Sequence, residues 1–196
     1  MKTHHILGVL LAGGASRRFG EPKALYELDG KPFIQYSLDA LHENTEDIVI
    51  VSQPDLIHQI QQQSTYDVIL DEEQFRGDGP LAGIYSAMKH VHSEWYMVLP
   101  CDTPYIHSEV LYQLRSYTER YSNIDAIVPK VAGRKQPLIA MYNRRCLPII
   151  EKNLKENCLK IGMLFQAVET MFIEEHEWNH PEAFRNINEK DDLSFS

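Results

Sequence analysis

The chain has 196 residues, of which 43% are hydrophobic and 24% are charged. This composition is typical of a globular protein with a sizeable core, and the length predicts one domain over residues 1–196. The formal net charge of −9 argues against a large nucleic-acid surface, so we expect no nucleic-acid partner. No stretch approaches the roughly 20 apolar residues of a membrane helix, so we expect no membrane partner either.

Strand-like and helix-like runs alternate along the chain, which predicts an α/β protein. Short runs rich in Val, Ile and Leu predict strands at residues 6–11, 47–51, 68–70, 97–99, 126–128, 138–142 and 171–173. Residues 24–28 are expected to be short and extended, and residues 130–137 to form a polar loop. Helical spacing of apolar residues predicts helices at 33–41, 56–60, 81–91, 108–120 and 147–154, with Ser108 as an N-cap.

Informative residues follow four of these strands. A glycine-rich loop follows the first strand, Ser52 and Gln53 follow the second, Asp71 the third and Asp102 the fourth. In an open parallel sheet, ligands bind outside the carboxyl ends of the strands. We therefore predict one binding site at this edge of the sheet.

The glycine-rich loop has the residues of a phosphate site. Gly13 and Gly14 have no Cβ, so the backbone there can turn sharply and approach a ligand closely. Backbone N–H groups in such a loop can hold phosphate oxygens. Arg17, Arg18 and Lys23 add positive charge that could meet a polyphosphate. The alternative is a turn before a solvated basic segment.

The spacing of the glycines excludes two common phosphate motifs. A dinucleotide fold requires G-x-G-x-x-G, whereas Gly13 and Gly14 are adjacent. A P-loop requires Lys followed by Ser or Thr, whereas Ala24 follows Lys23. The loop is therefore a third kind of phosphate site.

The first loop carries the string Leu11-Ala12-Gly13-Gly14-x-Ser16-x-Arg18-x-Gly20-x-x-Lys23, which resembles the signature of nucleotidyltransferases that activate sugars and cofactors. With two glycines after Ala12, it most resembles the molybdenum cofactor guanylyltransferases, the MobA family, whereas related cytidylyltransferases have alanine at the position of Gly13. The resemblance implies a Rossmann-like three-layer sandwich with a mostly parallel central sheet. It also implies that the loop binds GTP, with Lys23 on the phosphates.

A second motif, Pro100-Cys101-Asp102-Thr103-Pro104, follows the fourth strand. A carboxylate held there suits Mg²⁺, which prefers oxygen ligands and often bridges carboxylates to substrate phosphates. The alternative is a turn or N-cap role for Asp102. The D-x-P string resembles the family's magnesium site, which implies the metal role. Cys101 is expected to pack in the interior, because no histidine partner is evident.

The loop from Asp71 to Gly83 is acidic, which makes it a poor phosphate site. A carboxylate can instead accept two N–H bonds from the N1/N2 edge of guanine, although a solvated acidic loop is the alternative. The string Gly79-Pro80-Leu81-Ala82-Gly83 resembles the guanylyltransferases and implies that Asp71 lies in the nucleotide site.

Two further segments are candidates for binding the acceptor. Arg134 and Lys135 could meet an anionic acceptor or could form a basic hairpin tip. Asn186 and Asn188 resemble the family's N-x-N segment, which approaches the metal and the acceptor. The family often has an asparagine in the loop after the second strand. This chain has Ser52-Gln53 there, so the sequence does not predict how that loop contacts the nucleotide.

The resemblance implies transfer of GMP from GTP to the terminal phosphate of molybdopterin, with Mg²⁺ as cofactor. Arg18, Lys23 and Asp102 are the expected catalytic residues, acting by positioning and charge stabilisation. Proteins of molybdenum insertion and of target-enzyme maturation are the expected partners. Two alternatives stay open: a related nucleotidyltransferase that uses CTP or a sugar-phosphate acceptor, and a non-catalytic nucleotide-binding module.

The cysteines indicate a reducing compartment. Cys101, Cys146 and Cys158 are odd in number and widely spaced, so they form neither a disulfide framework nor a metal pattern. The N-terminal residues lack the apolar core and cleavage site of a signal peptide. We therefore expect the protein to be located in the cytoplasm.

Overall fold

A computed structural model describes residues 4–14, 19–189 and 191–192. Within these residues the central sheet has eight strands in the order β10-β7-β9-β6-β1-β4-β5, with β8 paired to β7. The strands of this sheet are β1 (Ile6–Leu11), β4 (Asp47–Ser52), β5 (Asp67–Leu70), β6 (Trp95–Pro100), β7 (Ala126–Val131), β8 (Arg134–Lys135), β9 (Ala140–Asn143) and β10 (Thr170–Ile173). A separate hairpin joins β2 (Glu27–Leu28) to β3 (Lys31–Pro32).

The sheet is mostly parallel. β1 lies between β4 and β6 and runs parallel to both, β5 is parallel to β4, and β10 is parallel to β7. Only β9, among the strands of β10-β7-β9-β6-β1-β4-β5, runs antiparallel to its neighbours β6 and β7. The predicted α/β architecture is therefore confirmed.

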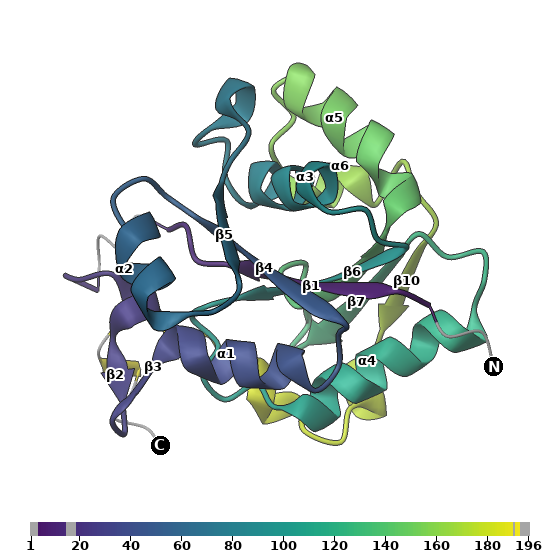
Figure 1. Ribbon diagram of the computed structural model, residues 1–196. Helices are drawn as coiled ribbons and strands as arrows, with labels where there is room; N and C mark the ends of the chain where they lie inside the picture. Colours follow the sequence, from purple (N-terminus) through teal and green to yellow (C-terminus); the bar gives the residue numbers. More distant parts are fainter. Residues whose placement is uncertain (1–3, 15–18, 190, 193–196) are drawn as a thin grey trace.

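Helices cover both faces of the sheet (Figure 1). One face carries α1 (Phe33–His42), α2 (Ile57–Gln63) and α4 (Ser108–Arg120), and the other carries α3 (Pro80–His90), α5 (Leu147–Lys155) and α6 (Ile161–Leu164). No helix of the described chain is long and apolar enough to cross a membrane.

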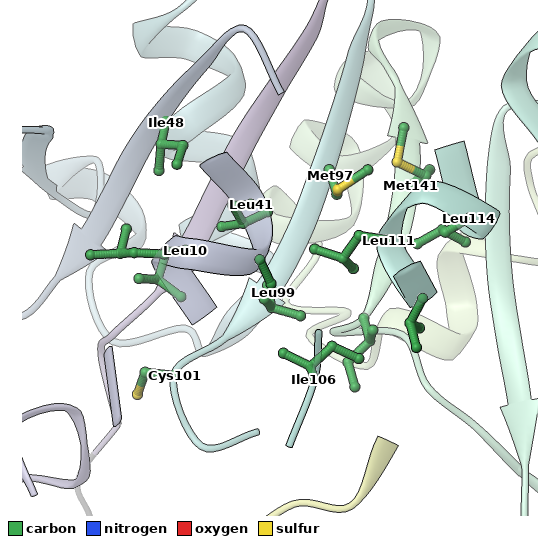
Figure 2. Close-up of a cluster of buried hydrophobic side chains, with 14 of the residues drawn as sticks. Leu10, Leu41, Ile48, Met97, Leu99, Cys101, Ile106, Leu111, Leu114 and Met141 are labelled. Atoms are coloured by element: carbon green, nitrogen blue, oxygen red, sulfur yellow. The ribbon is translucent and has the colours of Figure 1, made fainter. Parts of the chain in front are cut away.

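The central strands are apolar throughout because successive side chains point to opposite faces of the sheet and both faces are buried. Ile6 and Leu10 of β1 point into one core, while Leu7 and Val9 point into the other. Figure 2 shows the first core, where Leu41 of α1 and Leu111 of α4 face side chains of β1 and β6. Burial on both sides fixes the strands, and with them the loops at their carboxyl ends.

Three sequence-based expectations need correction. Residues 24–28 are not extended throughout, because a 3₁₀ turn at Lys23–Leu25 precedes β2. Ser108 is the first residue of α4 and not its N-cap. Its hydroxyl accepts a hydrogen bond from Asn44 Nδ2 at 3.1 Å and so joins the segment after α1 to α4. The polar loop 130–137 contains the short strand β8, which pairs with β7.

Candidate functional site

A cavity of about 600 Å³ opens at the carboxyl ends of β1, β4, β5 and β6. This volume lies in the range of small-molecule sites. The lining includes residues from the ends of these strands and from the loops that follow them: Leu11, Ala12, Gly13, Gly14, Lys23, Ser52, Gln53, Asp71, Cys101 and Asp102. The rule for open parallel sheets therefore located the cavity correctly from the sequence.

Lys23 and Asp102 form an ion pair at the rim of this cavity. Lys23 Nζ lies 3.0 Å from Asp102 Oδ2 and also donates to Asn188 Oδ1 at 3.3 Å. The Lys23 side chain is 13% exposed and that of Asp102 21% exposed. Lys23 is thus packed and paired, so the alternative of a solvated basic segment does not describe this residue.

The backbone around Asp102 is fixed by four hydrogen bonds. Cys101 N–H donates to the carbonyl of Leu11 at 3.1 Å, and Ile187 N–H donates to the carbonyl of Asp102 at 2.9 Å. The carbonyl of Pro100 accepts from the hydroxyls of Ser37 and Thr103, each at 3.1 Å. These contacts hold the carboxylate against the loop that follows β1.

Asp71 lies in the same cavity, directly after β5. Burial raises the pKa of Asp71 above its ordinary value of 3.8, while a hydrogen bond from Gly77 N–H and the charge of Arg76 oppose the shift. The loop is anchored next to it: Ser86 Oγ accepts from Glu72 N–H at 2.8 Å and donates to the carbonyl of Ala82 at 2.7 Å. A desolvated carboxylate of this kind is suited to accepting N–H groups of a ligand.

Of Gly13 and Gly83, which both line the cavity, only Gly83 is tightly packed. A Cβ on Gly83 would lie 2.9 Å from Leu11 Cδ2 and 3.7 Å from Asp71 Oδ1, so any larger residue here would displace the Leu11 side chain in the cavity wall. A Cβ on Gly13 would come no closer than 3.7 Å to Ser52 and would meet no clash. Neither Gly13 nor Gly14 has a positive φ, so the expected sharp turn is not made by left-handed backbone there.

Of the four residues expected to bind the acceptor, two lie at the cavity or contact its lining, and two do not line it. Asn186 lines the cavity and Asn188 contacts Lys23, whereas Arg134 and Lys135 are absent from the cavity lining. Lys135 instead places Nζ 4.1 Å from the ring centroid of Phe172. Arg17 and Arg18 lie outside the described residues.

The donor atoms near Lys23 suit a hard cation. Asp102 supplies a carboxylate and Asn188 an amide oxygen, and Mg²⁺ is commonly held by one or two protein oxygens together with substrate phosphates. Within residues 4–14, 19–189 and 191–192, no three His, Cys, Asp or Glu side chains gather as a metal site. The set fits a metal that arrives with a nucleotide and is held mostly by its phosphates.

Cys101 lines the cavity but is poorly suited to nucleophilic chemistry. Burial raises the pKa of its thiol to about 12, so the thiol is neutral at ordinary pH. This agrees with the expected packing role.

Sequence reasoning missed several residues of the site. Leu138 and Arg76 line the cavity, and Ser37 and Ser86 anchor two of its loops. A serine inside an apolar helical face was the available signal for Ser37 and Ser86, because a buried hydroxyl must find a partner. Nothing in the sequence indicates Leu138.

Comparisons with known proteins point to one family. Residues 8–170 match the family model of the MobA-like NTP transferase domain. The chain is 42% identical over 189 residues to a "probable molybdenum cofactor guanylyltransferase" of Halalkalibacterium halodurans, covering 96% of both chains. It is 41% identical to a protein of the same description from Bacillus subtilis, covering 96% of this chain and 92% of the other.

A solved structure has the same fold. The molybdopterin-guanine dinucleotide biosynthesis protein A of Archaeoglobus fulgidus superposes with a TM-score of 0.82 at 25% identity, covering 96% of this chain and 95% of that chain.

Proposed function

The chain belongs to the MobA-like NTP transferase family, and from this premise we propose that it transfers GMP from GTP to the terminal phosphate of molybdopterin. An oxygen of the acceptor phosphate attacks the α-phosphorus, a new phosphoanhydride bond forms, and the bond from the α-phosphorus to the β-phosphate oxygen breaks to release pyrophosphate. The acceptor is already an anion, so no covalent enzyme intermediate is required. The observation that supports this most is that Asp71 and the Lys23–Asp102 pair line one cavity.

The triphosphate occupies the glycine loop in this proposal. Leu11, Ala12, Gly13 and Gly14 lie at the end of β1, where their backbone can follow the phosphates. Lys23 stabilises the charge that grows on the leaving pyrophosphate, and a cation that gains interaction in the transition state accelerates the step. Arg18, outside the described residues, is the second cation proposed for this role.

Asp102 is proposed to hold Mg²⁺. A metal held there would supply positive charge to stabilise the anionic phosphates during the transfer. Lys23 is paired with Asp102, so the carboxylate that would hold the metal also positions the ammonium beside the phosphate site. The side-chain oxygen of Asn188 accepts a hydrogen bond from Lys23 Nζ at 3.3 Å, so it is close to both Lys23 and the proposed metal site.

Asp71 is proposed to select guanine. Its carboxylate accepts the N1 and N2 protons of the base, and a purine without those donors leaves it unpaired in a desolvated pocket. Asn186 and Asn188 are proposed to bind the acceptor. Arg134 and Lys135 remain predicted contacts to a more distant part of the acceptor. We also propose that residues 1–196 act as one catalytic domain in the cytoplasm, together with molybdenum-insertion and target-maturation proteins.

The test is pyrophosphate release from each of four nucleoside triphosphates, with molybdopterin and Mg²⁺ present. We expect turnover with GTP to exceed turnover with ATP, CTP or UTP by at least a hundredfold, on the scale of losing paired hydrogen bonds in a buried site. Preference for CTP, or turnover only with a sugar phosphate, would identify a different nucleotidyltransferase. Tight GTP binding without pyrophosphate release would indicate a binding module.

A further inference from the structure

Beside the site lies a small apolar cluster that is separate from the two cores of the sheet. Phe19, Phe33 and Ile187 are buried in it, and Tyr26, Leu28 and Tyr105 pack against them. We refer to these six residues as the site-edge cluster. Its rings are in edge contact, with centroids 4.8 Å apart for Phe19 and Tyr26 and 5.4 Å apart for Tyr26 and Phe33.

Members of the site-edge cluster are close in the chain to residues of the cavity. Tyr26 follows Lys23 by three residues, Tyr105 follows Asp102 by three, and Ile187 separates Asn186 from Asn188. Ile187 also contacts the site through its backbone, because its N–H donates to the carbonyl of Asp102 at 2.9 Å. The cluster therefore touches both partners of the ion pair through short stretches of chain.

Lys23 and Asp102 receive little support from regular structure. Lys23 begins a three-residue 3₁₀ turn, and Asp102 lies in a turn after β6. Residues 185–189 form neither helix nor strand. Close-packed side chains leave little freedom to the chain that carries them, so packing can replace secondary structure as the source of rigidity.

We infer that Ile187 is a positioning residue: it packs into the site-edge cluster and bonds to Asp102, and so holds the Lys23–Asp102 geometry. This inference rests on the proposed function. Shortening the side chain leaves a cavity beneath the site and frees the backbone that carries Asn188. A displacement of about 1 Å at reacting groups can cost a hundredfold in rate, whereas the base pocket around Asp71 is untouched.

The first test compares Ile187→Ala with Ile150→Ala, a matched control in α5. Both isoleucines are 0% exposed, but Ile150 belongs to the core beneath α3 and α5. At a temperature where circular dichroism shows each variant folded, we expect kcat of Ile187→Ala to fall by about tenfold to a hundredfold, with KM for GTP changed less than about threefold. We expect the control to keep kcat within about twofold. Ile187→Val removes a single methyl group, so its kcat should lie between those of wild type and Ile187→Ala, and it serves in place of Ile187→Ala if the latter does not fold.

The second test is hydrogen exchange of the nucleotide-free protein, which needs no turnover. Peptides that carry Lys23, Asp102 and residue 187 should exchange faster in Ile187→Ala or Ile187→Val than in wild type, and Ile150→Ala should leave them unchanged. Unchanged exchange there, or equal loss of kcat in the control, would overturn the positioning role. A wild-type protein that releases no pyrophosphate from GTP would instead refute the proposed function, with the exchange result still deciding the role of Ile187.

Discussion

Replacing Lys23 by alanine removes the cation that our account assigns to the leaving pyrophosphate. The ammonium lies 3.0 Å from Asp102 Oδ2, and this ion pair holds it in place. Losing one preorganised charge-stabilising donor commonly costs about a hundredfold or more in rate, so we expect kcat/KM to fall by about that factor. Lys23→Arg should restore only part of it, because a planar guanidinium does not replace a compact ammonium in a tight loop.

The same substitution should lower stability to a limited extent. At a separation of 3.0 Å, opposite unit charges attract by about 1.4 kcal/mol in water and about 5.5 kcal/mol at a dielectric constant near 20. Desolvation and side-chain ordering offset most of this, which leaves a net contribution of about 1–2 kcal/mol for a pair with partial access to solvent. For a chain of 196 residues that corresponds to a decrease in Tm of about 2–8 °C.

The assay is steady-state pyrophosphate release with molybdopterin as acceptor, together with thermal melts. Lys31→Ala is the matched control, because Lys31 of β3 forms an ion pair with Asp39 of α1 and is absent from the cavity lining. Its kcat/KM should stay near that of wild type. A Lys23→Ala enzyme with near-normal kcat/KM, or an equal loss in Lys31→Ala, would refute the reasoning.

Three further outcomes are expected. Asp102→Asn should nearly abolish turnover even at saturating Mg²⁺ while the fold persists in circular dichroism, and wild-type rates would remove Asp102 from the metal site. The pKa of Asp71 is raised in the folded state, so the stability that this carboxyl contributes below pH 3.8 is lost as the pH rises through its folded pKa. Asp71→Asn should therefore keep or raise Tm at pH 7, while KM for GTP increases. A lower Tm at pH 7 would contradict the burial argument. Gly83→Ala should raise KM for GTP more than it lowers kcat, since its Cβ would press on Leu11 Cδ2 at 2.9 Å, and titration of a fluorescent GTP analogue checks this.

The elements that sequence reasoning located well are those whose pattern is local. β1, β4 and β6 are apolar on both faces because helices cover both sides of the sheet, and α1 and α4 show helical spacing. The strand-end rule then brought Asp71 and Asp102 to one cavity, although the two lie 31 positions apart in the chain.

What sequence reasoning missed depends on contacts between distant segments. The burial of Lys23 follows from its pairing with Asp102 and Asn188, which lie 79 and 165 positions away, and a lysine among glycines and arginines gives no sign of either. The antiparallel direction of β9 was not predicted, because a short, mostly apolar run such as Ala140–Asn143 specifies a strand without specifying its orientation. The role of Ile187 is hidden for the same reason, since one isoleucine between two asparagines shows no periodicity.

The central claim is that GMP passes from GTP to an acceptor phosphate, and labelled GTP tests it most directly. With the label on the α-phosphorus, Mg²⁺ and molybdopterin, we expect the label to appear in a guanine dinucleotide of molybdopterin, with one unlabelled pyrophosphate released for each product. Lys23→Ala should form the same product about a hundredfold more slowly. Label that stays in GTP or appears in GDP, or transfer of a γ-label to the acceptor, would contradict the account.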